Sequence, residues 1–125
     1  MNINQIGLGP TTWSVIATAT NATATATKAA VAHTNVTVPA QRHVITGFSF
    51  SASTGAYTGS PTLTVYNDTT PIYTFQLDST SHAPLNVELP HPFVCNQGVA
   101  CSISATALGV GLVATVCIRG MTISD

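Results

Sequence analysis

The chain has 125 residues, of which only 6% are charged, where an ordinary soluble domain has roughly 25%. Three Lys and Arg against four Asp and Glu give a net charge of −1, and no basic run occurs, which excludes binding to nucleic acid or to a membrane through a basic patch. The length predicts one domain, and a hydrophobic content of 45% predicts a folded chain with a sizeable core.

The first residues differ from the rest of the chain. Gly7, Gly9 and Pro10 interrupt any regular strand, so we expect residues 1–12 to form a flexible arm and residues 13–125 to form the domain. The arm has neither a positively charged start nor a continuous apolar run, which a secretory signal requires. Synthesis in the cytoplasm is therefore expected.

A strand pattern follows the arm. From Ala17 to Thr27 the sequence alternates Ala and Thr, which places β-branched hydroxyl residues on one face of a strand and small methyl groups on the other. The alternation changes phase at Asn21, which predicts a bulge or a tight bend there. Another strand is predicted over Ala30–Val38, ended by Pro39.

The middle of the chain keeps the period of two residues. In Arg42–Ala52 the apolar residues Val44, Phe48 and Phe50 are predicted to share one face of a strand. The segment Ser53–Pro61 is rich in Ser, Thr, Gly and Pro, which is the composition of a loop.

A hairpin is predicted after this loop. Thr62–Tyr66 and Ile72–Leu77 are alternating strands on either side of the turn-forming segment Asn67–Pro71. The second strand is predicted to turn three apolar side chains to one side: Tyr73, Phe75 and Leu77. Leu85–Leu89 alternates again, and we expect Pro90 and Pro92 to end that strand.

The last third follows the same rule. Val99–Ala107 alternates apolar and hydroxyl residues, and Gly109 and Gly111 bracket a turn into a final long strand that ends near Ile123. The most hydrophobic stretch, Ile103–Ile118, falls short of the roughly 20 apolar residues that a membrane span needs. It is interpreted as two buried strands.

The elements taken together are about eight short strands divided by turn-forming clusters, with no helix signal and no linker. They predict a single-domain, all-β antiparallel sandwich of jelly-roll type with a short N-terminal arm. The scarcity of charge and the small Ala, Ser and Thr faces leave little repulsion between copies, which favours close association of subunits. We therefore expect a homotrimer.

No catalytic set is evident in the sequence. The carboxylates Asp68, Asp78 and Glu88 lie in turns or at the polar positions of strands, where solvated side chains are usual. The histidines have no ligand spacing on one strand face: His33, His43, His82 and His91. The sequence therefore predicts no enzyme, no structural metal and no cofactor.

Three cysteines cannot all pair within one chain. Cys95 and Cys101 are six positions apart, a spacing that matches no common zinc pattern, and free thiols are the simplest interpretation. A bridge between these two across the intervening turn stays an alternative. His91 beside the two thiols is the one set with residue types suited to a metal.

Two parts of the chain are candidates for partner binding. The arm carries the apolar residues Ile3, Ile6 and Leu8, which can add to the sheet edge of a neighbouring subunit. Trp13, at the junction of arm and domain, is interpreted either as a core anchor or as an exposed interface anchor, because tryptophan is common at both. The sequence does not separate these two roles.

Four segments resemble one known class of protein. Ala26–Ala32, Arg42–Ser51, Leu63–Asp68 and Gly98–Ala105 are similar, in that order, to the strand pattern of β-sandwich head-decoration (cement) proteins of tailed bacteriophages, over residues 13–123. The resemblance implies a structural virion protein on the outer surface of the capsid, often a trimer, that binds the major capsid protein and stabilises the assembled head. It implies no catalytic residue.

Two other classes stay open. A carbohydrate- or receptor-binding module of a phage tail or head fibre shares the sandwich fold and would use loop aromatics such as Tyr57 and Trp13. A jelly-roll enzyme of the cupin kind would need several histidines and a carboxylate converging inside the barrel, and the histidine spacing argues against this class.

Overall fold

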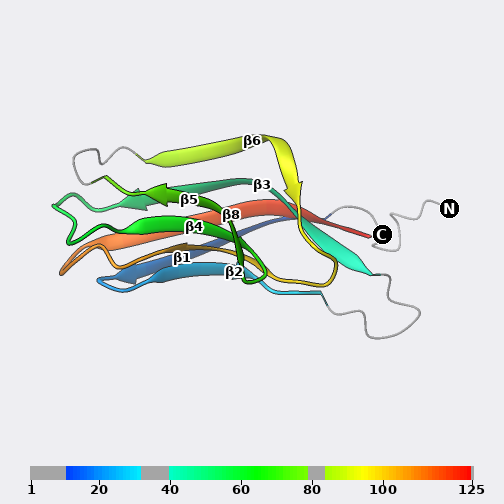
Figure 1. Cartoon of the computed structure of the whole chain (residues 1–125), viewed down its shortest axis with the longest axis horizontal. Coiled ribbons are helices and arrows are strands. Elements are labelled where there is room, and N and C mark those ends of the chain that lie inside the picture. Colours follow the sequence, from blue (N-terminus) through cyan, green and yellow to red (C-terminus); the bar gives the residue numbers. More distant parts are fainter. Residues whose placement is uncertain (1–10, 32–39, 79–83, 125) are drawn as a thin grey trace.

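The computed structural model describes residues 11–31, 40–78 and 84–124. These residues form eight strands: β1 (Thr11–Thr20), β2 (Ala24–Lys28), β3 (Gln41–Ala52), β4 (Thr62–Asn67), β5 (Thr70–Gln76), β6 (Leu85–Val94), β7 (Cys101–Ala105) and β8 (Val113–Ser124). They make two antiparallel four-stranded sheets, with the strand orders β1-β8-β3-β6 and β2-β7-β4-β5 (Figure 1). We call these the first and the second sheet.

The connectivity is that of a jelly roll. Apart from the hairpin β4–β5, every connection passes from one sheet to the other. The two sheets therefore enclose one core. The predicted all-β sandwich is therefore confirmed. The predicted hairpin and the final long strand are confirmed as well, because β4 and β5 pair around a turn at Asp68, and β8 follows the turn that contains Gly111.

The core fills the space between the two sheets. Alternate residues of each strand point inward, as the period-two pattern predicts. Phe48 on β3 is fully buried, and its ring lies 5.7 Å from that of Phe75 and 6.0 Å from that of Tyr73, both on β5. These aromatic contacts connect the two sheets. The other fully buried large apolar side chains complete the core: Ile45, Leu63, Val65, Ile103, Leu108, Val116 and Ile118.

The prediction that Val44 shares a face with Phe48 and Phe50 is wrong. A β-bulge between Ile45 and Gly47 shifts the register of β3 against β6 and β8. One extra residue reverses the faces of all residues before it. Ile45 therefore points into the core with Phe48, and Val44 lies on the outer face of the first sheet.

The prediction that Pro90 and Pro92 end the sixth strand is also wrong. β6 continues to Val94, although its pairing with β3 is interrupted between Glu88 and Phe93. Figure 1 shows β6 bending sharply over this stretch. An edge strand tolerates proline because one side of its backbone has no strand to bond.

The phase change at Asn21 marks a bend between sheets. Asn21 has a left-handed φ of 47°, and the chain turns there from β1 in the first sheet to β2 in the second. Thr11 and Thr12, expected in the arm, are the first residues of β1. Most of the strand predicted over Ala30–Val38, and residues 1–10 of the arm, lie outside the described residues.

The sandwich has two distinct ends. The connections β1–β2, β3–β4 and β7–β8 lie at one end, together with the end of β5 and the start of β6, and we call this the loop end. The opposite end, which we call the Trp13 end, holds the start of β1 and the end of β8, because Trp13 pairs with Gly120 and Gln41 pairs with Ser124. The two ends carry different candidate sites.

Candidate interaction surfaces

Trp13 is half-buried at the inner side of the edge strand β1. Its indole N–H donates a hydrogen bond to Thr122 Oγ1 at 3.0 Å, and its ring lies against Gly120, where a Cβ would be 2.7 Å from Trp13 Cζ2. Lys28 Nζ lies 5.7 Å from the ring centroid, within the range of a cation–π contact. The ring therefore fastens the beginning of β1, where the arm joins the domain.

A hydrogen-bond chain continues from Trp13 into the interior. His43 is buried, and its Nε2–H donates to the carbonyl oxygen of Ala29 at 2.8 Å. Its Nδ1 therefore accepts from the Thr122 hydroxyl at 2.8 Å. The pKa of His43 is lowered, mainly by burial; its hydrogen bond to Ala29 opposes this shift, and the nearby charge of Lys28 adds to it. The His43 imidazole on β3 thus contacts Trp13 of β1, Thr122 of β8 and Ala29 of the segment after β2.

The outer face of the first sheet carries an apolar row near the Trp13 end. Val94 on β6, Val44 on β3 and Met121 on β8 are cross-strand neighbours on this face. Val44 is only 6% exposed although it faces outward, whereas Val94 is 51% exposed. Farther along the same face, Ile16 on β1 is 65% exposed. This face therefore carries accessible apolar side chains on both of its edge strands, β6 and β1.

A charged network interrupts that face. Arg119 Nη2 contacts Glu88 Oε1 at 2.7 Å and Asn86 Oδ1 at 3.0 Å, both on β6. To reach them, Arg119 crosses Gly47 on the intervening strand β3, where a Cβ would lie 2.6 Å from Arg119 Nη2. The glycine after the bulge thus provides the space for a salt bridge that spans β3.

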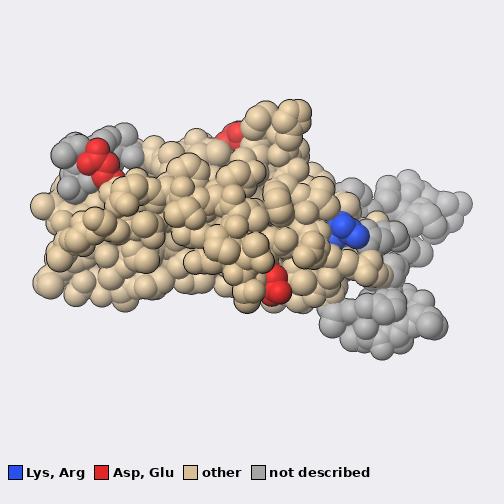
Figure 2. Space-filling view, in the orientation of Figure 1, with Lys and Arg blue, Asp and Glu red and all other residues tan. Residues whose placement is uncertain are grey.

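Hydroxyl side chains cover the outer face of the second sheet. Thr25, Ser104, Thr64 and Thr74 are register neighbours across all four strands, and Thr25 and Ser104 share a hydrogen bond at 3.1 Å. Figure 2 shows that acidic and basic side chains are few and scattered on the visible side of the molecule. The outer face of the second sheet is therefore rich in hydroxyl groups and poor in charge.

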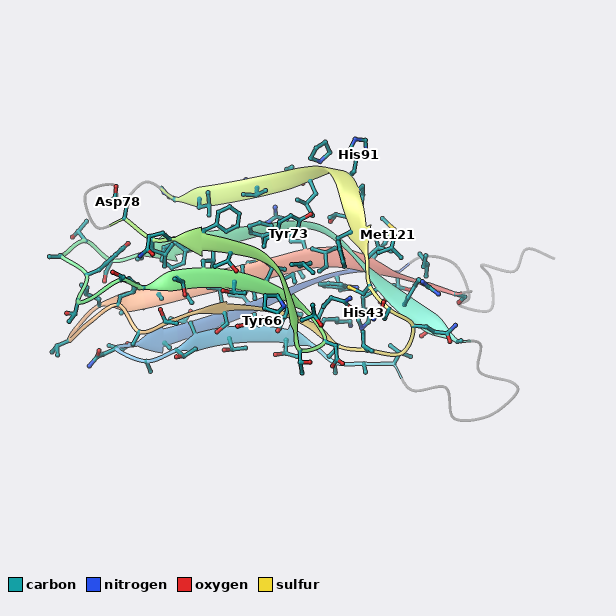
Figure 3. All side chains as sticks on the ribbon, in the orientation of Figure 1. His43, Tyr66, Tyr73, Asp78, His91 and Met121 are labelled. Carbon is teal, nitrogen blue, oxygen red and sulfur yellow. The ribbon has the colours of Figure 1, made fainter. Side chains whose placement is uncertain are left out.

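A pocket of about 220 Å³ opens at the loop end. Its walls are the apolar side chains Phe50, Phe75, Leu77 and Leu85, which come from β3, from β5 and the residue after it, and from the start of β6. Polar groups come from Tyr57, Gln76 and Asp78. Figure 3 shows Asp78 at this end of the molecule, with His43 and Met121 toward the other. Of the two expected platform aromatics, Tyr57 is therefore at this pocket, and Trp13 is at the opposite end.

The residues considered for catalysis or metal binding lie apart. Asp68 is in the β4–β5 turn, Asp78 is at the loop end, and His91 is exposed on the bend of β6. Among the residues that the structure describes, no three His, Cys, Asp or Glu side chains are grouped as a metal site would require. The described residues form no helix, and so no helix among them could cross a membrane. His33 and His82 lie outside the described residues.

All three cysteines are free thiols in the structure. Cys95 and Cys101 are buried and hydrogen-bonded to each other. This hydrogen bond lowers the pKa of Cys95. The same bond and burial raise the pKa of Cys101. Cys117 is half-buried on the outer face of the first sheet, 3.3 Å from Ser14 Oγ. The expectation of free thiols agrees with this arrangement.

Of the predicted partner-binding residues, only Trp13 is described, and Ile3, Ile6 and Leu8 lie outside the described residues. Sequence reasoning missed His43 and Thr122, which are 79 positions apart and meet across β3 and β8. It also missed the apolar row, because the bulge in β3 changes the face of Val44. No family model, no curated protein and no solved structure matches the chain.

Proposed function

We propose that this chain is a structural virion protein, a decoration or cement protein that binds the outside of an assembled phage head and stabilises it as a multimer. The observation that carries the proposal is the scarcity of charged side chains on the outer faces of the sandwich, in a chain with three Lys and Arg and four Asp and Glu. Rows of Thr and Ser cover one face, and the other carries the row Val94, Val44 and Met121. Such faces allow copies to pack closely with little electrostatic repulsion.

The root of the arm supports the same function. A capsid contact made by the arm can hold the domain on the shell only where the arm is firmly attached to the domain. Trp13 provides this attachment, because it anchors the start of β1 through its hydrogen bond to Thr122 and its packing on Gly120. Since Thr122 also bonds the buried His43, Trp13 is linked through it to β3. The proposal therefore assigns capsid binding to the arm and places the Trp13 end toward the shell.

The energetic benefit follows from the number of copies. A protein that binds only the assembled shell stabilises it by mass action, and many symmetric copies sum modest contacts. On this proposal the partners are the major capsid protein and further copies of the chain as a homotrimer. The protein acts on the outer surface of the virion after synthesis in the host cytoplasm.

Deleting residues 1–10 tests the role of the arm. We expect the shortened protein to keep its thermal midpoint within a few degrees of the parent, and to bind expanded empty phage heads about tenfold more weakly, a loss of about 1.4 kcal/mol. Co-sedimentation with heads made from the major capsid protein of the same phage gives the affinity. The full-length variant Ile3→Ser/Ile6→Ser/Leu8→Ser keeps the length of the arm and removes only its apolar side chains. It should weaken binding to a similar degree.

Two results would contradict this assignment. A shortened protein that unfolds outright would place the arm in the core of the domain. A shortened protein that binds heads as tightly as the parent would move the capsid contact to the loop end, with Ser53–Pro61 as the next segment to change.

A further inference from the structure

We propose that Cys95 and Cys101 form an intramolecular disulfide when the folded protein meets a small oxidant such as hydrogen peroxide. Both thiols are fully buried and hydrogen-bonded to each other, so they meet inside the core. The bridge joins the residue after β6, in the first sheet, to the first residue of β7, in the second. The inference does not depend on capsid binding.

The backbone holds both cysteines in position. Cys95 N–H donates to the carbonyl oxygen of His43 on β3 at 2.9 Å. In the register of the second sheet, Cys101 lies opposite Lys28 of β2 and Asn67 of β4. A disulfide requires a defined placement of its two cysteines, and these contacts fix that placement before the S–S bond forms.

The turn between the two cysteines is fixed as well. Gly98 has a left-handed φ of 73°, which lets the chain reverse within residues 96–100. Gly98 N–H donates to the carbonyl oxygen of Gln41 at 2.9 Å, and Asn96 N–H donates to Asn67 Oδ1 at 3.3 Å. The turn therefore brings the thiols together without help from a covalent bond.

The environment of the pair assigns a role to each sulfur. The hydrogen bond between the thiols lowers the pKa of Cys95, whereas the same bond and burial raise the pKa of Cys101. The thiolate is the nucleophilic form of cysteine. Cys95 is therefore the sulfur that attacks the oxidant, and Cys101 is the sulfur that closes the bridge.

The reaction has two steps. The Cys95 thiolate attacks one oxygen of the peroxide, the O–O bond breaks, and the departing hydroxide takes up the proton that Cys95 had lost. This leaves a sulfenic acid on Cys95 and one water. The Cys101 sulfur then attacks the Cys95 sulfur, the S–O bond breaks, and the Cys101 proton leaves with the hydroxide as a second water. Two thiols and one peroxide thus give one disulfide and two waters.

Burial selects the size of the oxidant. Neither sulfur is exposed, so a peptide disulfide such as oxidised glutathione cannot reach them in the folded protein, whereas hydrogen peroxide is little larger than water. Cys117 differs, because it is half-buried on the outer face of the first sheet beside Ser14. It is therefore not a partner for the buried pair.

The bridge has a structural consequence. It adds a covalent link between the two sheets and restricts the unfolded chain, so the oxidised protein should be the more stable form. In a reducing compartment the two thiols persist, and in an oxidising one the bridge closes. The free pair and the bridge are then two oxidation states of one site.

Treatment of the folded full-length protein with hydrogen peroxide, followed by unfolding and alkylation of thiols, tests the proposal. The Cys117→Ser variant keeps only the buried pair. We expect it to lose both alkylatable thiols and the mass of two hydrogen atoms, and to remain a single chain on a non-reducing gel. Its thermal midpoint should rise by a few degrees and return to the starting value after reduction. Oxidised glutathione should leave both thiols alkylatable over the same time.

Two further variants in the Cys117→Ser background test the assigned roles. Alanine takes the place of one buried cysteine in each, because a buried free cysteine packs as a small apolar residue. With Cys101→Ala, we expect peroxide to add oxygen to Cys95, since no second thiol is left to close a bridge. With Cys95→Ala, the remaining thiol of Cys101 should react about tenfold more slowly, because it stays protonated.

Four outcomes would overturn the proposal. The first is that both thiols remain alkylatable after peroxide treatment, or are lost only when denaturant opens the fold. The second is that the bridges form between chains. The third is that oxygen is added to the pair without a bridge. The fourth is that the bridged protein has a lower thermal midpoint than the reduced one. Because the assay contains no phage heads, its result does not depend on the proposed capsid binding.

Discussion

Replacing Phe48 with alanine should lower the free energy of unfolding by about 3–5 kcal/mol, the largest loss expected from any single core truncation in this chain. Phe48 is fully buried on β3, and its ring contacts Tyr73 and Phe75 of the other sheet. Truncation leaves a cavity between the sheets and removes both ring contacts, and aromatic pairs contribute beyond the area they bury. Denaturant unfolding of parent and variant measures the loss.

Ile16→Thr provides the matched control for this experiment. Ile16 is 65% exposed on the outer face of the same sheet, and threonine keeps the β-branched shape that a strand favours. We expect a change within about 0.5 kcal/mol. A loss below about 1 kcal/mol for Phe48→Ala would mean that this cluster does not hold the two sheets together.

The second large effect is expected at His43. His43→Leu should destabilise the protein by about 1–3 kcal/mol, because it leaves the buried Thr122 hydroxyl without its acceptor and removes the hydrogen bond to the Ala29 carbonyl. His43→Gln can supply one donor and one acceptor in place of the imidazole, so its loss should be smaller. Equal losses for both variants would contradict the hydrogen-bond chain described for this residue.

The same residue predicts a pH dependence with a definite sign. Burial lowers the pKa of His43 below 6.5 in the folded state, whereas the unfolded chain binds the proton at about 6.5. Below pH 6.5 the unfolded state therefore carries more protons, and stability falls as the pH falls toward the folded pKa. Between about pH 7.5 and pH 5 we therefore expect the stability of the parent to fall as the pH falls.

A variant at the same position separates this effect from general titration. His43→Gln should flatten the stability profile of the parent between about pH 7.5 and pH 5. A parent protein whose stability is constant over that range would show that His43 is not held neutral in the fold.

Strand positions were predictable because alternation is a local property. Thr62–Tyr66 and Ile72–Leu77 show it clearly, and they correspond to β4 and β5. The wrong face of Val44 and the wrong end of β6 both arise where pairing with strands distant in sequence determines the local structure. The bulge before Gly47 changes the face of Val44, and the edge position of β6 permits Pro90 and Pro92 within the strand.

The candidate sites were less predictable for the same reason. The sequence shows Tyr57 as a loop aromatic, but the pocket beside it is also lined by residues of β5 and of the start of β6. The alternation of residues along each strand does not predict that these two strands lie close together. Likewise, Trp13 and Thr122 meet only because β1 pairs with β8, the first strand with the last. A sequence pattern does not encode the sheet order that produces either contact.

Electron microscopy of the purified protein mixed with expanded empty heads of the same phage tests the proposed capsid binding directly. We expect added density on the outer surface at three-fold or quasi-three-fold positions, with the Trp13 end of each sandwich toward the shell and the loop end toward solution. Heads without added density, or density on tail or head fibres alone, would contradict it.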